Sequence, residues 1–327
     1  MKKIKRIALL TSGGDAPGMN AAIRSVVRSC AHYRIDCIGV FRGYQGLIEG
    51  DFVPLSARSV SSIINKGGTM LKSARSDEFR TKAGRKKAYE SLKAAEIDGL
   101  ILIGGDGSLT GGLIFNKEHN LPLIGIPGTI DNDIFGTDYT IGYDTALNTV
   151  VEVIDKIRDT ASSHNRLFFV EVMGRDAGFI ALNAGIGAGA EEILIPEEDL
   201  GLDRLLESLK RSKRTGKSSS IVVVAEGDTL GKNVFELRDY VEEHMPEYEV
   251  RVSVLGHMQR GGSPSCFDRV LASRLGVRAV ELLLDGYTNL MVGMINTKVQ
   301  SCTIEDALKG HHEINKELIR VSDIMSN

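Results

Sequence analysis

Aspartates flanked by glycines occur in two short motifs that could bring phosphate and a divalent cation together. One motif is Gly104–Ser108 (GGDGS), and the other is Pro127–Asp133 (PGTIDND). Mg²⁺ prefers one or two carboxylates together with phosphate oxygens, and phosphoryl transfer needs a carboxylate near the attacking hydroxyl. Asp131 and Asp133 alternate, so one can accept a proton while the other faces a cation. Together with Asp106 they predict a phosphoryl-transfer site, although either motif alone could be a solvated turn or a helix cap.

Other motifs have the residue types that bind phosphate groups. The glycine-rich turn Thr11–Asn20 (TSGGDAPGMN) leads into a helical pattern, whose N-terminal N–H groups would attract an anion. Arginines, and a histidine next to glycines, occur in Met173–Arg175 (MGR) and Leu255–Gly262 (LGHMQRGG), with Arg166 and Arg251 close by. Guanidinium groups suit a phosphomonoester. An ordinary βα turn and a structural histidine stay open as alternatives at this point.

Most of these motifs directly follow short apolar runs that alternate with helical patterns. Such alternation predicts an α/β protein with two doubly wound domains, mainly parallel sheets, and helices on both faces of each sheet. Ligands of such sheets bind at the carboxyl ends of the strands, which is where these motifs lie. Strands are predicted at residues 7–10, 99–103, 123–126, 167–172, 192–195, 221–225 and 250–255, and a helix at 144–159.

The composition excludes several other classes of protein. Of 327 residues, 36 are glycine and 7 proline, without a collagen period, and 42% are hydrophobic, which argues against disorder. A net charge of −3 gives no broad field for nucleic acid or a membrane surface. Four cysteines without a CxxC pair, and no apolar run long enough for a signal peptide or membrane helix, predict a cytoplasmic protein.

In their order along the chain, these motifs resemble those of bacterial ATP-dependent 6-phosphofructokinases, the phosphofructokinase A family. The resemblance extends from Thr11 to about Gly293 and includes TSGGDAPGMN, GGDGS, PGTIDND, EVMGR and LGHMQRGGSP. It implies Mg²⁺-dependent transfer of the ATP γ-phosphoryl group to the 1-hydroxyl of fructose 6-phosphate, in glycolysis. It also implies a homotetramer whose active sites are completed across a subunit interface, with ADP and phosphoenolpyruvate as possible effectors.

The resemblance also implies roles for individual residues. Asp131 matches the catalytic base, and Thr129, Arg75 and Arg175 match other residues at the reacting groups. Asp106 and Asp133 match positions that serve magnesium. The ATP site would include Gly14, Tyr44, Arg75, Ser76, Gly105, Asp106, Gly107 and Ser108. The fructose 6-phosphate site would include Thr129, Asp131, Met173, Gly174, Arg175, Glu226, His257 and Arg260, with Arg166 and Arg251 reaching it from a neighbouring subunit.

The effector site is implied less directly. Its matching residues are Arg24, Arg28, Arg58, Arg158, Gly189, Glu191 and Lys217. Two departures count against a simple transfer, because Ala57 and Thr215 stand where the family typically has an arginine and a lysine. Effector control is therefore expected to be weakened or altered. Arg24 and Arg28 lie one helical turn apart and could instead be two solvated side chains.

The resemblance implies a discontinuous first domain. The ATP-binding domain would comprise residues 1–142 plus 259–308, and the fructose 6-phosphate-binding domain residues 143–258 plus 309–327. ATP is the expected donor, because Gly107 and Gly128 replace the aspartate and lysine typical of pyrophosphate-using relatives. The alternatives are a pyrophosphate-dependent enzyme, a related kinase with another acceptor, and a non-catalytic sugar-phosphate sensor.

Overall fold

The computed structural model describes residues 4–162, 166–198, 201–214, 220–227 and 233–325. The chain divides into two compact units, each built from segments that are distant in the sequence. The first unit comprises Met1–Ile130, Ile134–Thr145 and Arg260–His312, and the second comprises Asp131–Asp133, Ala146–Gln259 and Glu313–Asn327. These limits differ from the expected domain boundaries by a few residues, and Asp131–Asp133 group with the second unit.

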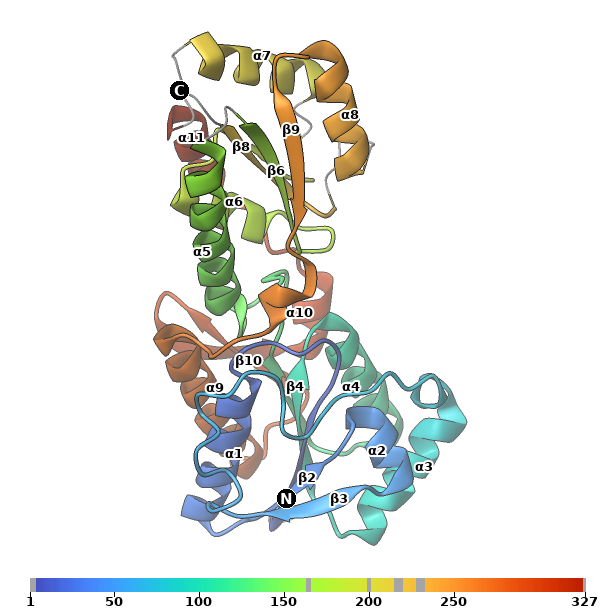
Figure 1. Cartoon of the computed structure of the whole chain (residues 1–327). Helices are drawn as coiled ribbons and strands as arrows, with labels where there is room; N and C mark the ends of the chain where they lie inside the picture. Colours follow the sequence, from blue (N-terminus) through green and yellow to red (C-terminus); the bar gives the residue numbers. More distant parts are fainter. Residues whose placement is uncertain (1–3, 163–165, 199–200, 215–219, 228–232, 326–327) are drawn as a thin grey trace. The chain divides into compact units, whose positions relative to one another are not determined.

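The first unit is built on a seven-stranded sheet with the order β11-β10-β5-β4-β1-β2-β3. Figure 1 labels β2, β3, β4 and β10 of this sheet. Only the two edge strands, β3 and β11, run antiparallel to their neighbours. The strands are β1 (Arg6–Thr11), β2 (Asp36–Val40), β3 (Phe52–Leu55), β4 (Gly99–Gly104), β5 (Leu123–Pro127), β10 (Leu290–Ile295) and β11 (Lys298–Thr303).

Helices cover both faces of this sheet because successive side chains of its buried central strands point to opposite faces. Ala8 and Leu10 of β1 belong to a core that α2, α3, α4 and α10 complete. Ile7 and Leu9 are equally buried and face the other way, where α1 and α9 pack together. The helices are α1 (Met19–Tyr33), α2 (Gly43–Glu49), η1 (Glu78–Arg80), α3 (Lys82–Ala94), α4 (Asp106–His119), α9 (Cys266–Leu284) and α10 (Ile304–Lys309).

The second unit contains a four-stranded parallel sheet with the order β7-β8-β6-β9. Its strands are β6 (Arg166–Val172), β7 (Glu192–Leu194), β8 (Ser220–Ala225) and β9 (Glu249–Val254). Its helices are α5 (Tyr143–Ser162), α6 (Phe179–Ala188), α7 (Gly201–Arg214), α8 (Val234–His244), η2 (Gly256–Arg260) and α11 (Lys316–Met325). The first turn of α5 belongs to the first unit and the remainder of this helix to the second, and Arg260, the last residue of η2, belongs to the first unit.

The predicted fold class is confirmed, and the sheet order brings the sequence motifs together. In the first unit, β1, β4 and β5 are neighbours, so the turns that follow them share one edge of the sheet. In the second unit, β8, β6 and β9 are neighbours, and the turns that follow them share an edge in the same way. Each unit therefore presents three motif-bearing turns at the carboxyl ends of its parallel strands.

Candidate active site

Backbone hydrogen bonds join the three turns of the first unit. Ser12 N donates to Ile103 O at 3.0 Å, and Gly128 N donates to Gly104 O at 3.0 Å. The turn after β1 is thus tied to β4, and the turn after β5 to the same strand. Asp106 is exposed in the first turn of α4, where backbone N–H groups point outwards. This edge has the features of a phosphate-binding surface with a carboxylate beside it.

Tyr44 lies beneath this surface instead of on it. Its hydroxyl donates to Ser108 O at 2.5 Å, and its ring stacks on Phe79 with the centroids 3.9 Å apart. The side chain is buried, and burial raises the pKa of the hydroxyl. Tyr44 therefore supports the first turn of α4 from below.

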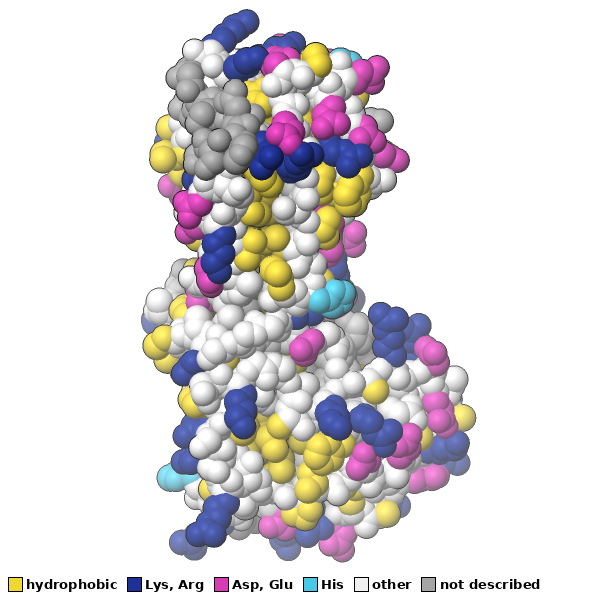
Figure 2. Space-filling model, in the orientation of Figure 1, with side chains coloured by type: hydrophobic (Ala, Val, Ile, Leu, Met, Phe, Trp, Pro, Cys, Tyr) yellow, Lys and Arg dark blue, Asp and Glu magenta, His cyan; other side chains and the backbone are white. Residues whose placement is uncertain are grey.

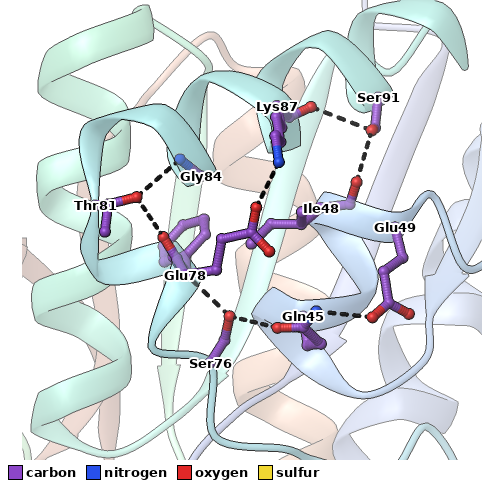
Figure 3. Close-up of polar contacts among 10 residues, drawn as sticks. Gln45, Ile48, Glu49, Ser76, Glu78, Thr81, Gly84, Lys87 and Ser91 are labelled. Carbon is purple, nitrogen blue, oxygen red and sulfur yellow. Dashed lines mark hydrogen bonds and ion pairs between the residues drawn. The ribbon is translucent and has the colours of Figure 1, made fainter.

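The segment with Arg75 and Ser76 is held by α2. Ser76 Oγ donates to Gln45 Oε1 at 2.7 Å and accepts from Phe79 N at 3.2 Å. Gln45 Nε2 in turn donates to Glu49 Oε1 at 2.7 Å, so the amide is fixed at both ends (Figure 3). Arg75 itself is exposed. Gln45 was not among the residues predicted from sequence, and no motif marks it.

The start of α3 completes the network around this segment. Thr81 Oγ1 accepts from Gly84 N at 3.0 Å and so caps the helix, and Lys87 forms an ion pair with Glu78 at 2.7 Å (Figure 3). The cap satisfies a backbone donor at the start of α3, and Thr81 Oγ1 also donates to Glu78 O at 2.8 Å, which ties η1 to this helix. The backbone around Ser76 is therefore anchored to α2 on one side and to α3 on the other.

Arg260 contacts the glycine-rich turn after β1. Its Nη1 donates to Asp15 O at 3.2 Å. A Cβ on Gly14 would lie 2.6 Å from Nη1 and 3.0 Å from Cζ, so a side chain at position 14 would displace this guanidinium. Two residues predicted for different ligands, Gly14 for ATP and Arg260 for the sugar phosphate, are thus in direct contact.

Asp131 is completely buried and lies beside a guanidinium. Arg175 Nε is 3.2 Å from Asp131 Oδ2. Arg175 has left-handed backbone, and so does Asn132, the residue after Asp131, with φ of 54° for each. The geometry therefore holds one carboxylate and one cation together, as expected for a site of proton and phosphoryl transfer.

Glu226, at the end of β8, fixes the backbone of the turn after β6. Its Oε1 accepts from Gly174 N at 3.3 Å and from Arg175 N at 2.8 Å. Burial, with Glu226 nearby, raises the pKa of Glu171 in β6. A Cβ on Gly227 would lie 2.0 Å from Arg175 O, so this glycine is also needed for the turn, and sequence reasoning missed it.

Gln259 joins this turn to η2. It is completely buried, its Oε1 accepts from Met173 N at 3.2 Å, and its Nε2 donates to Gly256 O at 3.0 Å. The motif that contains Gln259 was identified, but this residue was not. His257 is exposed on the same short helix, so Gln259 holds the backbone from which His257 projects.

Arg166 and Arg251 lie on the neighbouring strands β6 and β9 and share one carboxylate. Arg166 Nε is 3.0 Å from Glu249 Oε2, and Arg251 pairs with Oε1 of the same residue. Figure 2 shows a group of Lys and Arg side chains over β6 and β9 with acidic side chains beside it. The two predicted arginines, one on the edge strand β9 and one on its inner neighbour β6, are thus brought together with Glu249 between them.

Part of the expected effector set forms a cluster. Arg158 Nη2 donates to Ala188 O at 2.8 Å and to Gly189 O at 2.7 Å, and Arg158 Nη1 is 3.6 Å from Glu191. On the first unit, Arg24 is half-buried and Arg28 exposed on α1, and Arg58 is exposed. Lys217 lies outside the described residues. The structure therefore groups Arg158, Gly189 and Glu191.

The two glycines used to infer the phosphoryl donor differ in their surroundings. A Cβ on Gly107 would have nothing within 4 Å, so the open space beside it can receive a ligand. A Cβ on Gly128 would lie 3.1 Å from Ile103 Cγ2 and 3.2 Å from Met19 Cε. Gly128 is therefore required partly by packing within the unit.

Two negative findings apply to the described residues. No helix among them combines the length and apolar character needed to span a bilayer. None of their His, Cys, Asp and Glu side chains form a group of three that could hold a metal ion. All four cysteines are free thiols.

Comparison with known proteins agrees with the arrangement of these motifs. The family profile described as Phosphofructokinase matches residues 6–283. ATP-dependent 6-phosphofructokinase 1 of Thermus thermophilus is 54% identical over 323 residues, covering 99% of this chain and 100% of that protein. ATP-dependent 6-phosphofructokinase 2 of Bacteroides thetaiotaomicron is 50% identical over 321 residues, covering 98% of each. The phosphofructokinase structure from Saccharomyces cerevisiae matches with a TM-score of 0.88 and 36% identity, over 98% of this chain and 46% of the yeast chain.

Proposed function

Since the chain belongs to the phosphofructokinase family, we propose that it transfers the γ-phosphoryl group of ATP to the 1-hydroxyl of fructose 6-phosphate. Relatives that are about half identical over the full length are named ATP-dependent 6-phosphofructokinases, so the pyrophosphate-dependent alternative is not favoured. The observation that carries the chemistry is the buried carboxylate of Asp131 beside Arg175, on a turn at the carboxyl end of a parallel strand. The products are fructose 1,6-bisphosphate and ADP.

Asp131 is the general base of this reaction. It accepts the proton of the 1-hydroxyl as that oxygen attacks the γ-phosphorus and the bond to the β–γ bridging oxygen breaks. The 3.2 Å contact with Arg175 Nε orients the carboxylate, and Glu226 fixes Arg175 through its backbone N–H. Arg75 and Arg175 neutralise charge on the transferred phosphoryl group, while Thr129 contacts the reacting sugar.

Mg²⁺ is the proposed metal, with Asp106 and Asp133 as its protein ligands. Asp106 is exposed and Asp133 half-buried. Mg²⁺ is a hard cation that takes one or two carboxylates and obtains its other ligands from phosphates and water, so two aspartates are sufficient for this role. When bound, the cation would neutralise phosphate charge.

The binding roles follow the grouping of the motifs. ATP binds at the turns of the first unit that include Gly14, Gly105–Ser108 and Arg75–Ser76, with Tyr44 as support from below. Fructose 6-phosphate binds to Met173–Arg175, Glu226, His257 and Arg260. Arg166 and Arg251 hold the 6-phosphate of a neighbouring subunit in a homotetramer, for which the position of Arg251 on the edge strand β9, next to Arg166 on β6, is suitable.

Regulation and cellular location are also part of the proposal. ADP or phosphoenolpyruvate binds near Arg158, Gly189 and Glu191, where a cation already lies at the end of α6. The four free thiols support a cytoplasmic location.

A coupled assay tests the reaction and the role of Asp131. ADP formation is measured with fructose 6-phosphate and ATP, with and without Mg²⁺, and product formation is measured with pyrophosphate as donor. Activity only with pyrophosphate would overturn the donor, and no activity with either would favour a sugar-phosphate sensor. Asp131→Asn should bind both substrates but lose at least ~10²-fold in kcat, the scale of general-base catalysis. Near-normal turnover of that variant would rule out the role of Asp131.

A further inference from the structure

Asp268 is a completely buried carboxylate in the first turn of α9 that sequence reasoning did not connect with the reaction. Its Oδ1 accepts from Gly142 N at 2.8 Å. Its Oδ2 accepts from Thr145 N at 2.8 Å and from Thr145 Oγ1 at 2.5 Å. Asp268 therefore binds the first turn of α5 from a different helix, as an N-terminal cap supplied in trans.

The contact between the two helix starts is reciprocal. Ser265, the N-cap of α9, donates its N–H to Thr145 Oγ1 at 2.9 Å and its hydroxyl to Asp144, and it accepts from Asp268 N at 3.1 Å. Two helix N-termini, each with partial positive charge, thus lie together with two aspartates between them. Removing the carboxyl group of Asp268 would leave the buried donors of Gly142 and Thr145 without their acceptor.

The segment fixed by Asp268 runs beside the turn after β5. Ile141 N donates to Pro127 O at 3.1 Å, and Gly128 and Ile141 form a parallel bridge. Thr140 Oγ1 donates to Thr129 O at 2.7 Å in the protein interior. The main chain from 140 to 145 is therefore bound to Asp268 at one end and to the backbone at 127–129 at the other.

We propose that Asp268 is a positioning residue for phosphoryl transfer, acting through residues 140–145 on the turn that carries Thr129 and Asp131. This inference rests on the proposed function, because it requires those two residues to contact the reacting groups. The carboxylate does not touch substrate. Instead, the Asp268 carboxylate holds the start of α5, and with it the carbonyl of Thr129, in a fixed position relative to the sheet of the first unit.

The test is Asp268→Asn, which keeps the shape and one acceptor oxygen but places an amide NH₂ against Thr145 N–H. We expect kcat to fall about 10- to 100-fold, as for a misplacement of ~1 Å, while the KM values for ATP and fructose 6-phosphate change little. The matched control is Asp306→Asn. Asp306 lies three residues after Thr303, the N-cap of α10, as Asp268 lies three residues after Ser265, the N-cap of α9. Thr303 Oγ1 donates to Asp306 at 2.6 Å, and the kcat of Asp306→Asn should stay at the wild-type value.

A second pair of variants keeps the proposal testable if Asp268→Asn does not fold. Thr145→Val removes the hydroxyl that donates to Asp268 and should lower kcat. Thr145→Ser keeps this hydroxyl and should retain the wild-type kcat. All variants are assayed below their thermal unfolding midpoints, which are measured separately. Wild-type kcat in folded Asp268→Asn, or equal losses in the two Thr145 variants, would overturn the proposal. Full activity of Asp131→Asn would instead overturn the proposed function itself.

Discussion

Gly14→Ala should impair the enzyme through one side chain, Arg260. The new Cβ would lie 2.6 Å from Arg260 Nη1, whereas ordinary contacts begin near 3.4 Å. The nitrogen must therefore move by about 0.8 Å (3.4 minus 2.6), and its bond to Asp15 O would weaken. Folding should be little affected, because the end of a flexible side chain can move and the φ of Gly14 is not left-handed.

The expected loss can be worked out from this displacement. Guanidinium groups bind phosphate with N···O distances of about 2.7–2.9 Å, so a shift approaching 1 Å disrupts that geometry. We expect kcat/KM for fructose 6-phosphate to fall about 10- to 100-fold, or about 1.4–2.8 kcal/mol of transition-state stabilisation.

A double-mutant cycle in the coupled assay separates this route from a direct effect on ATP. In an Arg260→Ala background the Cβ at position 14 no longer meets a guanidinium, so Gly14→Ala should change kcat/KM less than about 2-fold. If the two losses instead multiply, alanine at position 14 does not act through Arg260 and the reasoning is refuted. The single variant Arg260→Ala is the matched control.

Three other residues give outcomes that standard assays can check. Arg251→Ala should raise the KM for fructose 6-phosphate about 10-fold by removing a charge-assisted bond to phosphate, and an unchanged KM would contradict its role. Gln45→Ala releases the hydroxyl of Ser76 and should raise the KM for ATP alone; equal changes for both substrates would count against it. Burial raises the pKa of Asp268 from 3.8 to about 6, so the folded state holds this proton more tightly than the unfolded state. That stabilisation, about 3 kcal/mol, is present below about pH 4 and is lost as pH rises through 6. In urea unfolding, the free energy of unfolding of wild type should therefore increase relative to that of Asp268→Asn as the pH falls from about 7 to about 4.5. A difference that stays constant over this range would refute the assignment.

The central strands were predictable because they are apolar runs buried on both faces. β4 (Gly99–Gly104) is completely buried, and its prediction from residues 99–103 was confirmed. β3 (Phe52–Leu55) and β11 (Lys298–Thr303) were not predicted, and both are partly exposed edge strands whose apolar pattern is weak. The inner strands β2 (Asp36–Val40) and β10 (Leu290–Ile295) were also not predicted, whereas the edge strands β7 and β9 were, so edge position explains only part of the misses. The order of strands was also out of reach, since it depends on contacts that no local pattern encodes.

The motifs predicted candidate ligand-binding residues but not the residues that hold those motifs in place. Asp131 and Arg175 came from separate motifs, and the structure brings them into contact. Gln259 and Asp268 act on partners far away in sequence, with Met173 86 residues away for the first and Gly142 126 residues away for the second. Such roles arise only from tertiary contacts, so no local pattern could have predicted them.

The pairing of β5 with β10 has a consequence for synthesis on the ribosome. β5 ends at Pro127 and its partner β10 starts at Leu290, and α9, which covers α1, begins only at Cys266. At 5–20 residues per second, the nascent chain carries β5 without β10 for roughly 10–30 s. During that interval a fully apolar strand has an open edge and one helix lacks its packing partner. Synthesis of the first unit therefore begins early, but its sheet can be completed only after residues 146–259 of the second unit have been made.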